Sequence, residues 1–173
     1  GGCPGWHIEC SAMGMKYLGE PIDIHTGGED NILPHHESEI AQSEGATGKP
    51  FVKYWLHVKH LLVDGEKMSK SKNNFYVLGD IIKKGYTAKA LRYMLMSAHY
   101  RSQLNFTWEG MDAAEKTVRS MIDFMDRLKR AEPTKENAAL GKAVKEAKET
   151  FEKSMDEDLN IAPAPAAVHD LVG

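Results

Sequence analysis

Two adjacent histidines in the stretch TGGEDNILPHHESE are the first residues of this sequence whose type and spacing suggest chemistry. If a helix begins at Pro34, His35 and Glu39 lie four residues apart on one face, about one turn, where both can reach a single ion. His36 then points elsewhere. Cys10, on an earlier predicted helix, could add a thiolate, and a set containing nitrogen and sulfur favours zinc over calcium or magnesium. The alternative is that both histidines are surface or core side chains with local hydrogen bonds.

The segment EKMSKSKNN, residues 66–74, is the second candidate for chemistry. Its lysines Lys67 and Lys70 are separated by Met-Ser in a polar loop that follows a predicted strand. Such a loop can bring two ammonium groups onto a triphosphate while charge develops on the leaving pyrophosphate. Unlike a loop of the GxxxxGK[ST] type, it offers side-chain charge more than backbone amides. The alternative is an ordinary linker rich in lysine and serine.

The charges near these two candidates are unevenly distributed. Residues 17–48 hold seven acids and no Lys or Arg, whereas residues 49–72 hold six lysines against Asp64 and Glu66. A region that favours cations is therefore followed by one that favours anions, as a site handling a metal and a polyphosphate requires. The alternative is that both regions are solvated faces.

The elements that must position these residues alternate between helix and strand in the first third of the chain. HIECSAMGMKYLG predicts a helix closed by Gly19, and PIDIHTGG predicts a short strand that runs into a glycine turn. After the helix that starts at the proline, YWLHVKHLLV predicts a second strand, turned by Asp64 and Gly65. This order indicates an α/β domain with a parallel sheet, in which 21–25 and 56–63 are neighbouring parallel strands.

From Val77 onwards the pattern is helical. Two series of apolar residues recur at steps of three and four, which predicts the buried core of a helical bundle. AEPTKEN is expected to link the two long helices, and NIAPAPAA to precede a last, short one. The two series are Met111, Ala114, Val118, Met121, Met125 and Leu128, and then Leu140, Val144, Ala147, Phe151 and Met155.

The composition fits one ordinary domain or parts of two. Of the 173 residues, 42% are hydrophobic and 27% are charged, and the formal net charge is -3. No run of about 18 apolar residues and no signal peptide occurs, which predicts a cytoplasmic protein without a membrane partner. The two cysteines, Cys3 and Cys10, are too few for a disulfide framework.

Four motifs together resemble one known family. Lys67 to Ser71 form the KMSKS signature of class I aminoacyl-tRNA synthetases, and GWHIECSAM, DIHTGGEDNILPHHESEIAQ and RYMLMSAHYRSQLNF resemble the cysteinyl-tRNA synthetases. The resemblance runs from Gly5 to about Asp126, and DEDLN near residue 160 resembles the start of that family's C-terminal helical domain.

The resemblance implies an α/β fold class: the second half of a doubly wound, Rossmann-like nucleotide-binding fold, followed by an α-helical bundle segment. The implied divisions are residues 1–66 for the catalytic half, residues 67–110 for the KMSKS loop and a connecting helical region, and residues 111–173 for the start of a helical tRNA-binding domain.

The resemblance also implies a zinc site and an amino-acid site. A cysteine, a histidine and a glutamate of these motifs match Cys10, His35 and Glu39, and a further cysteine comes from the N-terminal half of the family's chain. Trp6 matches a tryptophan that closes over the substrate amino acid. Zinc binds a thiolate far better than an alcohol, so such a site rejects serine without an editing domain.

The implied nucleotide site follows the first strand. HTGGED corresponds to a loop that contacts the adenosine, with Gly28 letting the nucleotide come close and Asp30 available to the ribose hydroxyls. Lys67 and Lys70 correspond to the mobile catalytic lysines of the activation step. The residues that the resemblance assigns to ATP are His25, Gly27, Gly28, Asp30 and Lys70.

The implied activity is ligation of cysteine to its tRNA. Cysteine reacts with ATP, bound with Mg²⁺, to give cysteinyl-adenylate and pyrophosphate, and the cysteinyl group then passes to the terminal ribose of tRNA. The implied partners are cysteine, ATP and the tRNA for cysteine, with no DNA.

The sequence also departs from the family. It contains neither the His-Ile-Gly-His signature nor the upstream zinc cysteine, and Cys3 stands where relatives often carry arginine. We therefore expect an incomplete piece of the enzyme that is inactive alone. Two alternatives stay open: an ATP-dependent cysteine ligase of mycothiol synthesis, which lacks a long tRNA-facing helical extension, and a non-enzymatic helical binding module with synthetase ancestry.

Overall fold

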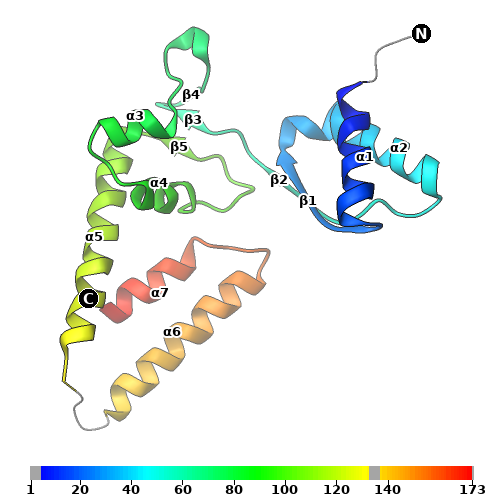
Figure 1. Ribbon diagram of the computed structural model, residues 1–173. Helices are drawn as coiled ribbons and strands as arrows, with labels where there is room; N and C mark the ends of the chain where they lie inside the picture. The colour runs from blue at the N-terminus through cyan, green and yellow to red at the C-terminus, as the bar shows by residue number, and fades with distance from the viewer. Residues whose placement is uncertain (1–4, 133–136, 173) are drawn as a thin grey trace. The chain divides into compact units, whose positions relative to one another are not determined.

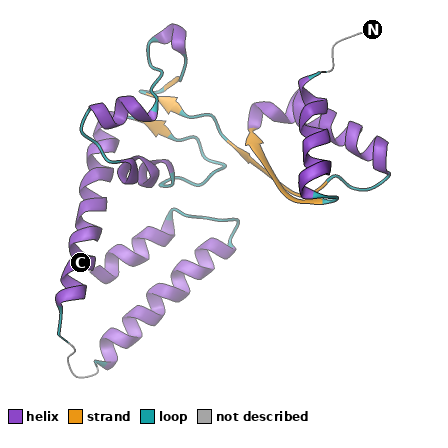
Figure 2. Cartoon of the chain, viewed as in Figure 1, coloured by secondary structure: helices purple, strands orange, loops and turns teal. Residues whose placement is uncertain are grey.

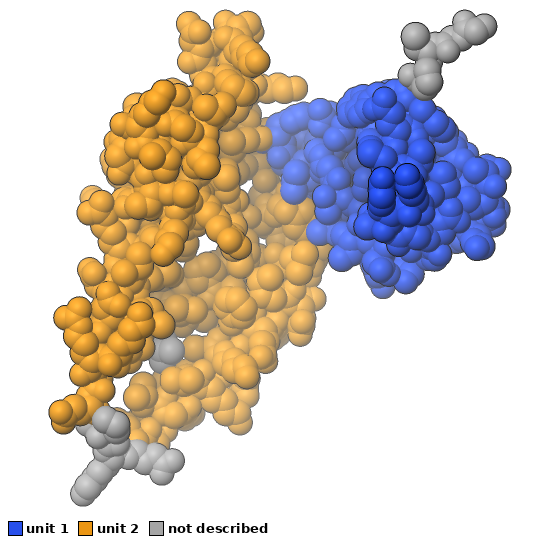
Figure 3. Space-filling view, in the orientation of Figure 1, with its two compact units in different colours: residues 1–60 blue, residues 61–173 orange. Residues whose placement is uncertain are grey.

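The structure, a computed structural model, describes residues 5–132 and 137–172. The chain divides into two units, residues 1–60 and residues 61–173, coloured separately in Figure 3. Each unit has its own small sheet and its own helices (Figure 2). Cys3 and most of the predicted linker AEPTKEN lie outside the described residues. Within the two described ranges, no helix is both long and apolar enough to cross a membrane.

The first unit alternates helix and strand, as predicted (Figure 1). Its first helix is closed by Gly19, which follows the last helical residue. The φ of Gly19 is +83°, a value that glycine adopts freely and that strains other residues. Short turns over residues 29–36 connect the first strand to the second helix. The elements are α1 (Trp6–Leu18), β1 (Ile22–Gly28), α2 (Glu37–Thr47) and β2 (Val52–Val58).

The two strands of this unit are parallel neighbours, which confirms the predicted pairing. The register runs from Ile22 opposite Val52 to Gly28 opposite Val58. The predicted limits of the second strand are wrong, because β2 starts earlier and ends at Val58. The last apolar residues of that run form a separate strand, β3 (Leu62–Val63), in the sheet of the second unit. The run YWLHVKHLLV therefore contributes one strand to each of two sheets.

Helices α1 and α2 pack against each other in the first unit, and α1 also contacts β1. Ile22 and Phe51 are buried there, and a Cβ at Gly14 would lie 2.9 Å from Cδ1 of Ile22, so glycine lets α1 approach the strand. Ile24 and Tyr54 are cross-strand partners and are 58% and 67% exposed. Within the described unit, that sheet face carries no covering helix.

The second unit opens with a short three-stranded sheet of order β4-β3-β5. Strand β4 (Glu66–Lys67) runs antiparallel to β3, and β5 (Asn105–Phe106) runs parallel to it. The predicted turn at Asp64 and Gly65 is confirmed, because it joins β3 to β4. Both turn residues have positive φ, +51° and +80°, as in the tight turns that match strand twist.

Helices form the rest of the second unit. α7 begins inside the segment NIAPAPAA and not after it, because Pro163 suits the first helical turn, where its missing N–H has no intrahelical partner. The core of this unit is a buried cluster of Val63, Ile81, Ala90, Met94, Phe106, Met111 and Ala114. The helices are α3 (Leu78–Lys83), α4 (Ala88–Leu95), α5 (Trp108–Arg130), α6 (Ala138–Asp156) and α7 (Pro163–Val172).

The two apolar series are not buried along their whole length, so the prediction of a continuous bundle core is wrong for the described chain. On α5, Met111 is fully buried but Leu128 is 52% exposed. On α6, Leu140 is 56% exposed and Val144 is 46% exposed. The physical reason is that α6 packs mainly on α7, and its apolar residues Leu140 and Val144 stay exposed among the described residues.

Candidate functional site

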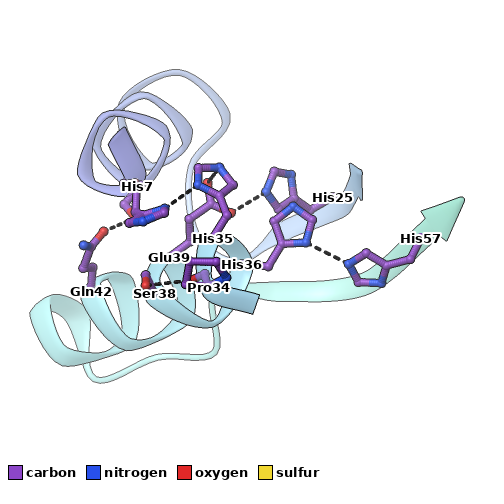
Figure 4. A network of polar contacts seen from close by, with 10 residues as sticks. His7, His25, Pro34, His35, His36, Ser38, Glu39, Gln42 and His57 are labelled. Carbon is purple, nitrogen blue, oxygen red and sulfur yellow. Dashed lines mark hydrogen bonds and ion pairs between the residues drawn. The ribbon is translucent and has the colours of Figure 1, made fainter. Parts of the chain in front are cut away.

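Cys10, His35 and Glu39, the candidate metal ligands, lie close together in the first unit. Each offers one ligand atom, and these atoms all lie within 4.8 Å of one another. Cys10 lies on α1, His35 in the turn before α2, and Glu39 in the first turn of α2, with His35 and Glu39 buried. Figure 4 shows the two α2-side residues facing the histidines around them.

The turn before α2 sets this geometry. Leu33 has extended backbone, with φ of −123° and ψ of 130°, so the helical conformation restarts at Pro34. His35 and Glu39 are then one turn apart, and Nε2 of His35 lies 3.5 Å from Oε1 of Glu39. Nδ1 of His36 lies 2.7 Å from Nε2 of His57, on β2, so this histidine takes a different direction.

Glu39 is the buried centre of the site, with none of its surface exposed. Its Oε2 lies 2.8 Å from Nε2 of His25, whereas its Oε1 is buried and has no hydrogen-bond partner. The 3.5 Å separation from His35 is too long for a good hydrogen bond. A buried polar atom without a partner costs about 1–3 kcal/mol. This oxygen, beside a thiol and an imidazole, fits the ligand preferences of zinc.

The thiol of Cys10 is held protonated by its surroundings. Burial, and then the neighbouring carboxylate of Glu39, raises the pKa of the Cys10 thiol. A cation bound between the two groups would reverse this effect, because metal ligation requires the thiolate.

Trp6 and His7 lie on the α1 side of His35. The Trp6 ring stacks on the His35 ring, with centroids 4.0 Å apart and 24° between planes, while Trp6 stays 59% exposed. Nδ1 of His7 lies 2.5 Å from Nδ1 of His35. With Nδ1 engaged in this way, Nε2 of His35 is the nitrogen left facing Glu39, which is how metal-ligating histidines are usually oriented.

A second group adjoins the first through the other oxygen of Glu39. His25, His36 and Glu39 also offer ligand atoms within 4.8 Å of one another. Burial, and then the neighbouring His25, lowers the pKa of His36 to about 4, so its ring is neutral near pH 7. His7 and His57 were not predicted for this site, because only their contacts through space, and no spacing in the sequence, connect them to it.

Of the residues assigned to ATP, His25, Gly27 and Gly28 lie in β1 and Asp30 directly follows it, at the end of the strand where parallel sheets bind ligands. Lys70 lies in the second unit. The side chain of Asp30 is 60% exposed, but the ring of His25 is turned towards Glu39. A Cβ at Gly27 would lie 2.6 Å from Cε1 of His36, and a Cβ at Gly28 would lie 2.5 Å from Oδ1 of Asp30. Gly27 therefore makes room for a buried histidine ring.

The KMSKS loop belongs to the second unit, where Lys67 ends β4 and Lys70 begins a short 3₁₀ turn. Asn74 closes the loop: its Oδ1 accepts from the Ser69 N–H at 2.8 Å and its Nδ2 donates to the Lys67 carbonyl at 3.2 Å. Met68 packs against the unit's core. Neither Lys67 nor Lys70 forms an ion pair with any residue that the structure describes. Both ammonium groups are thus available to an anion.

The comparisons with known proteins identify the family of the chain. Residues 1–116 match the family model for the catalytic domain of class I (C) tRNA synthetases. The chain belongs to this family.

Two curated relatives of the chain carry the name cysteine–tRNA ligase. The chain is 52% identical over 174 residues to the cysteine–tRNA ligase of Brachyspira hyodysenteriae, and 49% identical over 173 residues to that of Chlamydia muridarum. Each match covers 99% of this chain but 37% and 36% of the relative, so the chain spans little more than a third of their length.

A solved structure shares the fold. The LeuRS of Agrobacterium radiobacter K84, in a ternary complex with tRNA and LeuAMS, superimposes with a TM-score of 0.67 at 19% identity. The match covers 89% of this chain and 22% of that one. The mixed α/β fold class is therefore confirmed.

Proposed function

We propose that this chain is part of a cysteine–tRNA ligase, which joins cysteine and ATP into cysteinyl-adenylate and then transfers the cysteinyl group to tRNA. The observation that carries the proposal is the grouping of Cys10, His35 and Glu39 around a buried carboxylate oxygen without a partner. The relatives named cysteine–tRNA ligase, about half identical over the whole chain, support it.

Cys10, His35 and Glu39 are the proposed zinc ligands. Zinc at this position would supply a Lewis acid that prefers the thiolate of cysteine over the hydroxyl of serine. The protein's own residues orient these ligands: His7 fixes the His35 ring from one side, and His25 fixes Glu39 from the other. Trp6 would cover the side of a bound amino acid, and its stacking on His35 and its exposure of more than half support this role.

The proposed ATP site lies at the carboxyl end of β1. Asp30 would accept hydrogen bonds from the ribose hydroxyls. Gly28 leaves room for that carboxylate, because a Cβ at Gly28 would lie 2.5 Å from Oδ1 of Asp30. Lys67 and Lys70 would stabilise the negative charge that develops on the leaving pyrophosphate.

The finer division of the chain belongs to the same proposal. Residues 1–66 would form the second half of a doubly wound nucleotide-binding fold, supported by the parallel pair β1 and β2. Residues 67–110 would carry the KMSKS loop and a connecting region, and residues 111–173 would begin a helical domain that contacts tRNA. The long helices α5 and α6 favour this reading over a mycothiol-type cysteine ligase, which needs no tRNA-facing extension.

A zinc titration tests the site without relying on activity. The chain should bind zinc at one equivalent in competition with a chromophoric chelator, and Glu39→Gln should weaken zinc affinity by at least about 10-fold. The matched control is Glu37→Gln, an exposed glutamate in the same helical turn, which should change affinity by less than about twofold. Equal zinc affinity for Glu39→Gln and the control would overturn the ligand assignment.

Kinetics with the whole enzyme test the activity. Aminoacylation should require cysteine and tRNA, and serine should be rejected by a factor on the order of 10⁴ or more. Cysteine transfer to an amino sugar in place of tRNA would instead support the mycothiol-type ligase.

A further inference from the structure

A pocket of about 200 Å³ lies in the second unit, between α4 and the start of α7. Four lining residues from α4 and its C-cap occupy relative positions i, i+3, i+4 and i+7, so they share one helix face. The segment around the start of α7 forms the opposite wall. The pocket is lined by Lys89, Arg92 and Tyr93 on α4, by Met96 and Ser97 directly after this helix, and by Ile161 and Pro165 opposite them. The proposed ligase activity uses none of these residues.

Hydrogen bonds hold both ends of this pocket. The Tyr93 hydroxyl lies 3.2 Å from Nε2 of His169, which joins α4 to α7. On the other side, Asp158 accepts hydrogen bonds from the Tyr100 hydroxyl at 2.7 Å and forms an ion pair with Nε of Arg101 at 2.7 Å. These contacts fix the segment that carries Ile161 to the segment that follows α4. The pocket is therefore bounded by tethered walls.

The lining combines apolar walls with two positive charges. The Tyr93 ring, Met96, Ile161 and Pro165 provide apolar surface, and the stems of the two cations can add to it. Lys89 and Arg92 form no ion pair with any residue of the described ranges, and no acidic residue is among those that line the pocket. Both charges are thus free to act on a ligand.

We infer that this pocket binds a small aromatic carboxylate. The apolar walls suit a flat ring, and Lys89 and Arg92, one turn apart, suit a carboxylate at the edge of that ring. The volume is below that of sites for drug-sized ligands, so the ligand is limited to one or two fused rings. Inorganic phosphate would satisfy the cations but leave the apolar walls in contact with water.

Titration with 2-naphthoate and its neutral analogue 2-naphthamide tests this inference on the 173-residue chain. Methyl NMR signals of Met96 and Ile161 should shift saturably with naphthoate, with a dissociation constant on the order of 1 mM. The amide should bind at least about fivefold more weakly, because it lacks the charge. Equal affinity for acid and amide, or shifts confined to residues elsewhere, would overturn the inference.

Two double variants separate this site from general attraction to a positive surface. Lys89→Met with Arg92→Met should weaken naphthoate binding at least about tenfold. The matched control, Lys83→Met with Lys116→Met, removes the same charge from exposed positions outside the pocket and should leave binding unchanged. Similar losses in both double variants would show non-specific attraction and overturn the inference. Circular dichroism of each variant checks the fold, and the comparison of acid with amide uses only the unaltered chain.

Discussion

Glu39 connects two groups of side chains through its two carboxylate oxygens. One oxygen is bound by His25, and the other, without a hydrogen-bond partner, faces His35 and Cys10. A buried carboxylate of this kind is stable only when its surroundings compensate for its charge. The histidines around it therefore matter for the site even where they are not proposed ligands.

Gly27 is the residue on which the packing of these histidines depends most directly. Gly27→Ala should lower the free energy of unfolding of the first unit by about 1–3 kcal/mol, because the new methyl would overlap the buried His36 ring. Urea unfolding followed by NMR signals of that unit measures the change. Gly45→Ala is the control: no atom lies within 4 Å of a Cβ there, so alanine should stabilise α2 by about 0.5–1 kcal/mol. Equal effects at both glycines would contradict the packing argument.

Lys70 should act on the rate of activation more than on the binding of ATP. In the whole enzyme, Lys70→Ala should slow adenylate formation by roughly 100-fold or more, about 2.7 kcal/mol, because its contact with pyrophosphate forms chiefly in the transition state. Pre-steady-state kinetics with a separate ATP titration measures both steps. Lys72→Ala removes a loop cation already paired with Glu66 and should have a much smaller effect. A loss of ATP affinity in full proportion, with an unchanged chemical step, would make Lys70 a ground-state anchor.

At the residue scale, the sequence could predict contacts between residues one helical turn apart, but not contacts between distant segments of the chain. The pair His35 and Glu39 could be predicted because four helical residues make one turn, whatever the rest of the chain does. The contact of His57 with His36 depends on the parallel register of two strands, and no spacing rule reports it. The same holds for Gly27, whose neighbour is nine residues further along the chain.

At the element scale, Glu115 on α5 holds the start of α4. Its carboxylate accepts hydrogen bonds from the N–H and hydroxyl of Thr87, both at 2.9 Å, and pairs with Arg119 at 3.0 Å. The Thr87 N–H, and then the Arg119 side chain, lowers the pKa of Glu115. One carboxylate thus satisfies groups at the first turn of α4 and joins two helices of the core.

This lowered pKa predicts a pH-dependent stability. Because the folded-state pKa lies below the unfolded one, the contribution of Glu115 to the free energy of unfolding is present above the ordinary glutamate pKa and is lost as pH falls through the lower folded value. Glu115→Gln should therefore lower the free energy of unfolding by about 1–3 kcal/mol near neutral pH and by much less near the acid limit. Urea unfolding at both pH values measures it.

Glu132→Gln provides the control for this experiment. Glu132 is exposed, follows the end of α5 and makes no hydrogen bond or ion pair with the described residues, so its substitution should leave stability unchanged at either pH. A difference between wild type and Glu115→Gln that stays constant with pH would rule out the charge of Glu115 as the cause.

The sequence could predict the type and order of the elements, but not which elements pack against each other. The order helix, strand, helix, strand follows from local pattern, and the parallel pairing follows from the order. The division of the run YWLHVKHLLV into β2 and β3 was not predicted, because the residues between the two strands, Lys59 to Leu61, include no glycine or proline that would mark a break. The apolar series predicts that α6 has an apolar face, but the sequence pattern does not show whether another helix packs on that face.

At the scale of the whole molecule, the two units carry different parts of the proposed chemistry. The proposed zinc ligands lie in residues 1–60 and the KMSKS lysines in residues 61–173. A class I activation step also needs donors from the His-Ile-Gly-His signature, which does not occur in these 173 residues. The chain spans little more than a third of the length of these relatives.

The 173-residue polypeptide by itself should therefore show no measurable cysteine-dependent exchange of pyrophosphate into ATP. Removing charge-stabilising donors typically costs several kcal/mol of barrier, and each 1.4 kcal/mol, roughly, lowers the rate tenfold. The whole cysteine–tRNA ligase of Brachyspira hyodysenteriae, assayed in parallel, provides the positive control. Zinc binding by the polypeptide, measured beforehand, separates loss of catalysis from loss of folding. Exchange within about tenfold of the control would mean that these residues already contain a complete activation site, and that the proposed dependence on further donors is wrong.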